Sequence, residues 1–452
     1  MKIRKINWKN HPIFGTFELS FLDESSKPYN TIVIAGENGT GKTTILEILY
    51  TYLRTRAVDV TRKCEYIEFQ TDDEIMRCSL SKINNMINYH RNLYMGGTIR
   101  KGEPTYYRDN RWDPITDAPS KHVSFACVYT KAHIVDETKN ITSIGTHKLD
   151  EDLKKEKTGF EATDIKQLFV DLSNQDAQEF TSLAKQSPDK SITWYDYKPA
   201  SRMERFSSAF DNFFDGAIRY GEVKTMGGSH EILFKKGDKD IKIDDLSTGE
   251  SQIVYRGAYL LKNVGKLHGS IILIDEPEIS MHPSWQEKIL SYYRGLFTVK
   301  DEQIAQIIVV THSQEVIKEA YRLGDVKVIV LRRSKEGVLR HGEDEVKAVF
   351  KQDSFVETIY QAFGEATTDY HNALYGCIEE KDKMEDFTAS QTLVDYIRLY
   401  DDGTTKHEKV SLSEKIRHMI HHPENTNNKK YTPAELRQSI EAMRNYIINN
   451  GI

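Results

Sequence analysis

Nine consecutive residues have the types and the spacing needed to hold a phosphate group. They are Gly36-Glu37-Asn38-Gly39-Thr40-Gly41-Lys42-Thr43-Thr44, in the pattern G-x-x-x-x-G-K-[ST]. Glycines let consecutive backbone N–H groups turn inward as an anion nest at the start of a helix. Lys42 would place a positive charge on the β- and γ-phosphates of a nucleotide, and Thr43 would offer a hydroxyl to Mg²⁺. We therefore predict a nucleotide site in this loop.

A pair of acids follows a short aliphatic run, Ile271–Ile274. Asp275 and Glu276 stand where a buried strand would end. Phosphoryl transfer depends on positioning and charge compensation more than on covalent chemistry. We therefore expect Asp275 to hold the Mg²⁺ shell and Glu276 to polarise the attacking water. Two adjacent acids at a strand end are often only a solvated turn, but the phosphate loop favours the functional interpretation.

The elements around these residues indicate a parallel sheet. Residues 31–35 form an apolar run that ends at Gly36, which predicts a strand leading into the phosphate loop, and a helix should begin after Gly41. Later in the chain, predicted strands alternate with predicted helices, as in α/β proteins. The predicted strands are 271–274, 307–310 and 326–331, and the predicted helices are 251–261, 283–296 and 314–323.

The rest of the chain predicts different structures. Residues 3–8 and 17–21 alternate like antiparallel edge strands, as do residues 221–243. Residues 62–150 are polar and interrupted by Gly and Pro, which indicates an antiparallel or irregular insertion and no parallel core. Apolar residues recur at helical spacing in 164–182 and 201–214. Beyond residue 342 we expect only helices and loops, including an amphipathic stretch at 393–400 and a last helix from Thr432 onward.

Length and composition exclude several classes of protein. A chain of 452 residues is too long for one compact core, and we expect the parts 1–61, 62–235, 236–340 and 341–452. The net charge of −6 excludes a strongly basic, histone-like binder, although a local basic stripe for nucleic acid stays possible. The four cysteines are far apart without a C-x-x-C pair, which favours a reducing cytoplasm. The longest aliphatic runs have only strand length, so no membrane span is expected.

Two further motifs complete a series. Leu246-Ser247-Thr248-Gly249-Glu250 lies between the phosphate loop and the acids, and Val309-Val310-Thr311-His312-Ser313 follows them. The order resembles the ABC-type ATPase core. Asp275-Glu276-Pro277-Glu278, followed by Met281-His282-Pro283-Ser284-Trp285-Gln286, is most similar to the soluble SMC-like and overcoming-lysogenisation-defect-like branch.

This resemblance implies an α/β ABC-type ATPase head, a mixed β-sheet with flanking helices, an inserted lobe and a C-terminal helical domain. It also implies that ATP and Mg²⁺ are held by one set of side chains, with catalysis by Glu276 and the switch histidine. These side chains are Lys42, Thr43, Asp275, Glu276 and His312.

The same resemblance places Ser247 and Gly249 on the γ-phosphate of a nucleotide held by a second subunit. It therefore implies a head-to-tail dimer or a higher oligomer. Thr248 departs from the transporter signature, which usually has a second glycine there. The glutamine of the Q-loop has no clear position, and Gln175 and Gln178 are the candidates.

The chain further resembles stand-alone ATPase subunits of bacterial anti-phage systems, such as Septu (PtuA-like) and its retron-associated relatives. This resemblance implies an ATPase that oligomerises and gates a separate nuclease. A built-in Toprim nuclease is not expected, because no Asp-x-Asp follows the predicted strand 326–331.

Two alternatives remain open. The first is an ATP-gated ribonuclease, because Arg417 and His422 have the R-x₄-H spacing of HEPN ribonucleases. The second is a DNA-repair ATPase, for which the basic residues near the N-terminus, such as Arg4 and Lys5, are the support.

Overall fold

The chain divides into two compact units in the computed structural model. The first unit comprises Met1–Ile329 with residues 337–339, and the second comprises residues 330–336 with Arg340–Ile452. The predicted division into four parts is finer than this and stays a prediction. The structure describes residues 1–54, 63–70, 75–80, 87–95, 98–105, 127–130, 162–186, 191–226, 229–261, 269–333, 339–341, 348–350, 354–400 and 402–452.

A buried sheet forms the centre of the first unit, with the strand order β17-β16-β3-β15-β12-β8. Strands β3, β15, β12 and β8 run parallel, and every residue of these four strands is buried. Burial on both faces explains their continuous apolar sequences. The bounds are β3 Thr31–Gly36, β8 Cys127–Thr130, β12 Ile271–Asp275, β15 Gln306–Thr311, β16 Val326–Arg333 and β17 Leu339–His341. The predicted α/β class and the predicted strands of this sheet are confirmed.

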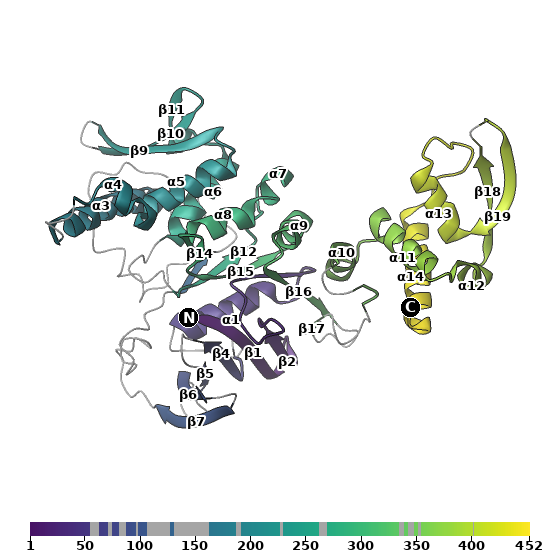
Figure 1. Cartoon of the computed structure of the whole chain (residues 1–452), viewed down its shortest axis with the longest axis horizontal. Coiled ribbons are helices and arrows are strands. Elements are labelled where there is room, and N and C mark those ends of the chain that lie inside the picture. Colours follow the sequence, from purple (N-terminus) through teal and green to yellow (C-terminus); the bar gives the residue numbers. More distant parts are fainter. Residues whose placement is uncertain are drawn as a thin grey trace. The chain divides into compact units, whose positions relative to one another are not determined.

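Helices connect and cover these strands (Figure 1). They are α1 Lys42–Arg54, α6 Thr248–Leu260, α7 Pro283–Gln286, α8 Ile289–Leu296 and α9 Gln314–Leu323. The prediction of one helix over 283–296 is wrong, because the chain turns between Gln286 and Ile289. The Glu319 carboxylate caps the new helix, accepting from the backbone N–H groups of Leu290 at 2.8 Å and Ser291 at 2.9 Å. This cap comes from α9, so no local pattern could predict it.

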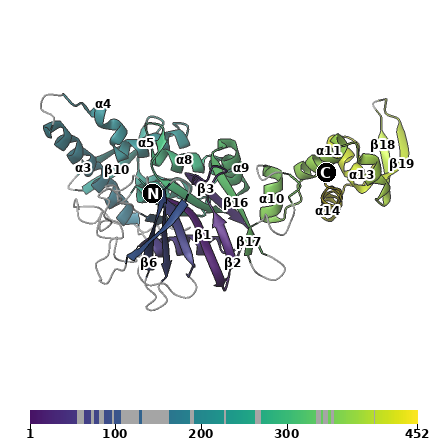
Figure 2. The same ribbon diagram turned by 60° about the horizontal axis from the view of Figure 1, so that its bottom comes forward.

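An antiparallel sheet of order β2-β1-β4-β5-β6-β7 adjoins the central sheet (Figure 2). Its strands are β1 Lys2–His11, β2 Gly15–Ser20, β4 Tyr66–Gln70, β5 Ile75–Leu80, β6 Ile87–Met95 and β7 Thr98–Thr105. The antiparallel prediction for the insertion is thus confirmed for β4 to β7 and wrong for β8. Four residues buried on both faces show no alternation, and β8 therefore gave no strand signal of its own.

One side chain ties the two sheets together. The Gln306 amide, at the start of β15, accepts from the Ile3 N–H at 2.6 Å and donates to the Ile3 carbonyl at 3.0 Å. It also donates to the Tyr29 carbonyl at 2.8 Å. Gln306 is fully buried, so its amide replaces the hydrogen bonds that a neighbouring strand would give β1.

A lobe of helices and a small sheet covers one side of the first unit (Figure 1). Phe206 and Phe210 of α5 are fully buried and stack at 5.5 Å, which confirms the core-facing stripe. The lobe also includes the antiparallel sheet β11-β10-β9. The elements are α3 Ala162–Gln186, α4 Trp194–Tyr197, η2 Lys198–Ala200, α5 Arg202–Phe213, β9 Ile218–Met226, β10 Ser229–Lys236, β11 Lys239–Lys242 and η3 Ile243–Asp245; a hairpin of β13 Thr298–Val299 and β14 Glu302–Gln303 precedes β15.

The second unit is a helical domain with one β-hairpin. Its elements are α10 Phe355–Phe363, α11 Thr368–Glu380, α12 Met384–Ala389, β18 Leu393–Leu399, β19 Thr405–Ser411, α13 Leu412–His421 and α14 Pro433–Asn450. The predicted last helix is confirmed, with a capping box between Thr432 and Glu435. The prediction of only helices and loops is wrong, because β18 pairs antiparallel with β19 and buries Tyr396 on α13. The β-forming residues Val394, Tyr396 and Ile397 decide this structure.

The core of the second unit contains a buried ion pair. Arg444 donates to the Glu357 carboxylate at 2.8 Å, and their side chains are 5% and 3% exposed. The hydroxyl of Tyr370 donates to the other oxygen of Glu357 at 2.6 Å. Arg444 also lies 4.9 Å from the ring centre of Tyr360. Every charge in this group has a partner inside the same core.

Candidate nucleotide-binding site

The predicted phosphate loop connects β3 to α1 as expected. Gly39 and Gly41 have φ angles of 77° and 83°, a left-handed conformation that glycine adopts without strain. The hydroxyl of Thr40 closes the turn by donating to the Glu37 carbonyl at 2.8 Å. Because α1 begins at Lys42, its first backbone N–H groups have no acceptor within the helix. The loop therefore directs donors to one point, as anion binding requires.

The side chain of Lys42 lies back over its own loop. Its ammonium donates to the carbonyls of Gly36 at 2.7 Å and Glu37 at 3.0 Å. It also lies 3.4 Å from Nδ1 of His312. Burial lowers the pKa of Lys42 to about 8, although nearby carboxylates, Glu276 foremost, act in the opposite direction. Burial has the larger effect on this ammonium, so an anion bound here would stabilise its charge further.

The acid at the end of β12 meets the first turn of α1. The Thr43 hydroxyl donates to the Asp275 carboxylate at 3.1 Å. The hydroxyl of Tyr129, on the neighbouring strand β8, donates to the other oxygen of Asp275 at 3.2 Å. Asp275 is only 5% exposed, and burial raises its pKa. The two predicted Mg²⁺ ligands are thus brought together.

The second acid meets the predicted switch histidine. Nε2 of His312 lies 3.1 Å from the Glu276 carboxylate. An ammonium only donates, so Nδ1 of His312 accepts from Lys42 and Nε2 carries the hydrogen donated to Glu276. Burial, with the charge of Lys42, lowers the pKa of His312, which keeps the ring neutral. The three side chains form one connected line across the strand ends.

Glu276 has a strained backbone that its neighbours hold in place. Its φ of 44° is unusual for a residue other than glycine. Its N–H donates to the Val310 carbonyl at 3.0 Å, and its carbonyl accepts from buried Arg256 at 3.0 Å. Strain of this kind costs about 1–3 kcal/mol and persists where the surroundings fix it, often at active sites. Here it turns the side chain of Glu276 toward His312.

A third acid, Glu278, fixes the backbone of the histidine turn. One oxygen of its carboxylate accepts from the Thr311 hydroxyl and from the N–H of His312, both at 2.7 Å. The other oxygen is buried and has no hydrogen-bond partner among the residues that the structure describes. Burial raises the pKa of Glu278, and the neighbouring charge of Glu276 adds to this.

These charges fit a divalent cation. Four carboxylates, those of Glu276, Glu278, Asp275 and Glu37, act on the ammonium of Lys42. Asp275 and Glu278 have raised pKa values, chiefly because they are buried, and the neighbouring charge of Glu276 adds to this. Carboxylate and hydroxyl oxygens are the ligands that Mg²⁺ takes when substrate phosphates complete its shell. Thr43 and Asp275 are the residues that would hold Mg²⁺.

Ser247 and Gly249 begin helix α6. Ser247 is the N-cap, with its hydroxyl accepting from the Glu250 N–H while the Glu250 carboxylate accepts from the Ser247 N–H at 2.9 Å. Gly249 has no room for a side chain, because a Cβ there would lie 2.9 Å from the ring of Trp285 and 3.2 Å from the Ser280 carbonyl. The predicted contact of this turn with a second subunit stays a prediction.

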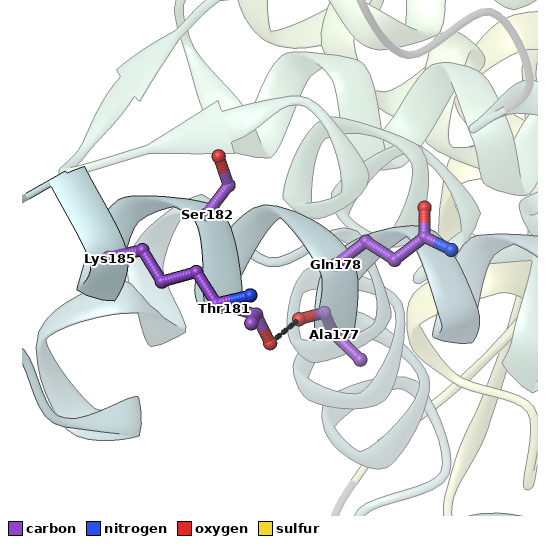
Figure 3. Close-up of a pocket in the computed structure, with 5 residues that line it drawn as sticks. All are labelled: Ala177, Gln178, Thr181, Ser182 and Lys185. Atoms are coloured by element: carbon purple, nitrogen blue, oxygen red, sulfur yellow. Dashed lines mark hydrogen bonds between the residues drawn. The ribbon is translucent and has the colours of Figure 1, made fainter.

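The Q-loop candidates lie elsewhere, on helix α3. Gln178 lines a hollow of about 410 Å³ with Ala177, Thr181, Ser182 and Lys185. Figure 3 shows all five residues on α3, with the Thr181 hydroxyl donating to the Ala177 carbonyl at 2.8 Å. Gln175 donates to Glu179 of the same helix at 3.4 Å. The hollow contains no residue of the phosphate loop.

The predicted ribonuclease pair has separate partners in the second unit. Arg417 contacts α11, with its guanidinium 4.7 Å from the ring centre of Tyr375 and 3.8 Å from the Glu379 carboxylate. His422 is exposed at the end of α13, and its Nδ1 lies 3.1 Å from the Glu424 carboxylate. Helix α13 ends at His421, so His422 follows the helix as its C-cap, with a φ of −124° and a ψ of 65°. The ribonuclease hypothesis stays untested, without support from these contacts.

Sequence reasoning gave no role to several residues of the site. Tyr129 supports Asp275, and Arg256 supports the backbone of Glu276. Gln286 binds Ser313, the residue after His312. Arg256 lies three turns along the helix that starts at Ser247, but no sequence pattern shows that its side chain reaches the end of β12. Only the position of Tyr129 in a strand beside β12 could have signalled its role.

Comparison with known proteins agrees with the motifs. Residues 171–318 match a family model described as "AAA domain, putative AbiEii toxin, Type IV TA system". Septu protein PtuA from Bacillus thuringiensis is 29% identical over 130 residues, which cover 26% of this chain and 31% of that protein. The chain thus spans about a third of the length of that relative.

Solved structures of SMC heads are also similar. The SmcHead bound to the C-winged helix domain of ScpA is 16% identical, with a TM-score of 0.41, over 75% of this chain and 97% of that chain. The SMC head domain from Thermotoga maritima is 15% identical, with a TM-score of 0.38, over 75% and 98%.

The family match shows that residues 171–318 are similar to an AAA domain. The partial match to Septu protein PtuA supports the resemblance to Septu-type ATPases that the motifs indicated. Within the described residues, no helix is both long and apolar enough to cross a membrane.

Proposed function

We propose that this protein binds ATP with Mg²⁺ and hydrolyses it at the carboxyl ends of β3, β12 and β15. The observation that supports this most strongly is the convergence of three motifs distant in the sequence. Lys42 lies 3.4 Å from His312, His312 lies 3.1 Å from Glu276, and Thr43 lies 3.1 Å from Asp275. Neighbouring parallel strands bring these side chains to one edge, where ligands of open α/β sheets bind.

Lys42 is proposed to exchange partners when ATP binds. Its ammonium now donates to two carbonyls of the loop, Gly36 and Glu37. The β- and γ-phosphates would accept from the same ammonium and, unlike the neutral carbonyls, would bring opposite charge to it. The backbone donors of Gly39 to Thr44 would hold the phosphates from the opposite side.

Thr43 and Asp275 are proposed to hold the metal ion, and their separation of 3.1 Å suits adjacent ligands. Mg²⁺ would supply positive charge against the phosphate oxygens during transfer. Tyr129 would keep the Asp275 carboxylate oriented through its own hydrogen bond at 3.2 Å. The ion would also compensate the excess of carboxylates at this edge.

Glu276 is proposed to orient and polarise the attacking water. The Glu276 side chain is about a quarter exposed, so water reaches its carboxylate. The ring Nε2–H of His312 donates to this carboxylate and fixes its direction. Because His312 is neutral, it can accept from Lys42 and donate toward Glu276 or a phosphate oxygen. Hydrolysis would follow from this positioning together with charge compensation.

The site is proposed to be shared between two copies of the chain. Ser247 and Gly249 would meet the γ-phosphate of a nucleotide held by the second copy, as the resemblance to ABC-type ATPases implies. The Trp285 ring and the Ser280 carbonyl occupy the space that a Cβ of residue 249 would need, so only glycine fits in this turn. ATP would then promote a head-to-tail dimer or a larger assembly.

At the level of the cell, we propose a cytoplasmic ATPase subunit of a bacterial anti-phage system. The partial match to Septu protein PtuA and the ABC-type motifs support this proposal. The ATPase would gate a separate nuclease or another effector through its ATP-dependent assembly. Nucleic acid is a possible further ligand.

Substitution of Lys42 tests the nucleotide site. Lys42→Ala should abolish ATP hydrolysis and weaken ATP binding by at least about tenfold, because alanine cannot replace charge-assisted contacts. Lys166→Ala is the matched control, since Lys166 is also buried but pairs with Asp244 on the lobe. ATP turnover and calorimetric binding are the measurements. A Lys42→Ala protein that hydrolyses ATP at the parent rate would disprove the phosphate-loop assignment.

Substitution of Glu276 tests the shared site. Glu276→Gln keeps the shape but removes the charge that polarises water, so ATP should bind without turnover and the assembled state should accumulate. Light scattering with saturating ATP and Mg²⁺ should show a larger particle than without ATP. Glu287→Gln, an exposed change beyond α7, should behave like the parent. A Glu276→Gln protein that stays monomeric with bound ATP would contradict the composite site.

A further inference from the structure

The short helix α7, Pro283–Gln286, lies between two parts of the candidate site. Its residue Trp285 contacts the Ser247–Glu250 turn, and its neighbour Gln286 contacts the turn that contains His312. Consecutive helical residues point about 100° apart, so a single turn can reach two different elements. Neither residue touches the proposed nucleotide residues Lys42 and Thr43 in any described contact.

The Trp285 side of this helix is packed tightly. The Trp285 ring stands 2.9 Å from where a Cβ of Gly249 would lie, and real Cβ atoms do not approach so closely. Phe214 packs edge-on against the indole at 5.3 Å, and Phe213 lies at 6.2 Å. Phe213 and Phe214 therefore support the indole on the side away from Gly249, and the indole cannot move away from Gly249 without disturbing these buried rings.

The Gln286 side is a network of hydrogen bonds. Its Oε1 accepts from the Ser313 hydroxyl at 2.5 Å, and its amide donates to the Met281 carbonyl at 3.0 Å. The same Ser313 hydroxyl caps α9 by accepting from the N–H groups of Glu315 at 3.1 Å and Val316 at 3.3 Å. Gln286 thus fixes the residue that directly follows His312.

We propose that Trp285 and Gln286 are positioning residues of the nucleotide site. Trp285 sets the place of the Gly249 turn, and Gln286 sets the place of the His312 turn. Because both belong to one helical turn, a displacement of Gly249 by a bound nucleotide is transmitted to His312 and Glu276 of the same chain. This inference rests on the proposed ATPase function, and it deepens that function by naming how the two turns are linked.

Gln286→Met tests the Gln286 contact, because methionine keeps the length but removes both hydrogen bonds. The expected result is a fall in kcat of about tenfold with a KM for ATP within about twofold of the parent, since the phosphate loop is untouched. Gln303→Met is a matched control. Gln303 accepts from the Thr31 hydroxyl at 3.1 Å and donates to two carbonyls at 2.9 and 2.8 Å, but it lies before β15, at the opposite end from His312.

A double-mutant cycle distinguishes positioning from general destabilisation. If Gln286 acts through Ser313, then Gln286→Met combined with Ser313→Ala should lower kcat no further than the larger single effect. Independent, additive losses would overturn the link to His312. On the other side of the helix, Trp285→Leu should lower kcat, while Trp194→Leu on α4 should not.

Hydrogen exchange gives a second result that needs no nucleotide. In Gln286→Met the amides of residues 315 and 316 should exchange at least about tenfold faster, because their cap loses its support. In Gln303→Met they should keep the parent rate. Unchanged exchange in Gln286→Met would disprove the positioning role even if the protein hydrolyses no ATP. An inactive parent protein would disprove the proposed function separately.

Discussion

Two regions of this protein bury charged side chains, and they satisfy those charges in opposite ways. In the core of the second unit, Glu357 is paired with Arg444 and with the hydroxyl of Tyr370. At the strand ends of the first unit, burial lowers the pKa of Lys42 and raises that of Asp275. The first arrangement is complete within the chain, whereas the second would be completed by a ligand. Charges that are paired within the chain stabilise the fold, whereas charges that lack full compensation are suited to binding a ligand.

The largest effect is expected from breaking the complete arrangement. Arg444→Ala leaves the Glu357 carboxylate buried without its partner, which should lower the free energy of unfolding of the second unit by about 3–5 kcal/mol. Arg437→Ala, on the exposed face of the same helix, should cost less than about 1 kcal/mol. Hydrogen exchange of α14 measures the change. All four tryptophans belong to the first unit, so their fluorescence reports whether that unit stays folded.

Acid should produce the next largest effect through His371, which is fully buried in the second unit and lies 3.0 Å from the Ser439 hydroxyl. Burial lowers the pKa of His371 to about 4, from 6.5 in the unfolded chain. Between these values the unfolded chain binds a proton that the folded chain does not, so stability falls as the pH falls. The contribution is complete above pH 6.5 and reaches a loss of about 3 kcal/mol below pH 4.

The variant His371→Gln isolates this histidine from the other titrating groups. Denaturant unfolding of parent and variant, followed by hydrogen exchange of α11 at a series of pH values, gives the difference. The variant should show a flatter profile between pH 6.5 and 4. If the stability of parent and variant changed with pH in parallel, protonation of His371 in the folded protein would cost no free energy, and water would have to reach this core.

The smallest change in the free energy of unfolding should come from Asp275→Asn, and this variant should be more stable than the parent, not less. Removing one of the adjacent acids relieves repulsion with Glu276, so the ligand-free protein should gain up to about 1 kcal/mol of stability. The rise in Tm that ATP and Mg²⁺ produce in the parent should disappear. Asp176→Asn is the control, because Asp176 is buried but accepts from Ser201 at 2.6 Å and Arg202 at 2.9 Å. The Asp176→Asn variant should lose stability. If Asp275→Asn lost as much stability as Asp176→Asn, the carboxylate of Asp275 would be as fully compensated within the chain as that of Asp176.

The parts of the site that the sequence predicted are those specified locally. The phosphate loop needs its glycines and Lys42 within a few residues, and Asp275 and Glu276 directly follow a continuous apolar strand. Such patterns can be recognised in the sequence because they depend on local backbone geometry and on burial of the strand itself. The parallel sheet that joins them followed from the alternation of strands and helices.

Two of the parts that were missed depend on partners far along the chain, and a third depends on pairing within a hairpin. Helix α8 begins at Ile289 because Glu319 caps it, and Asp275 is oriented by Tyr129 from a strand of four residues. The hairpin that starts at Leu393 was predicted as part of a helical region, since seven residues with mixed polarity fit either period. Its pairing with residues 405–411 decided the outcome.

The amide bridge between Ile3 and Gln306 has a consequence for synthesis on the ribosome. The two residues are 303 positions apart, and β3 pairs with β15 across a similar interval. At about 5–20 residues per second, the strand before the phosphate loop waits roughly 15–60 s for its neighbour to emerge. During that time β3 lacks its neighbour β15, and chaperones would have to cover its apolar side chains. The proposed nucleotide site of a growing chain can therefore be completed only after β15 and the following His312 have left the ribosome.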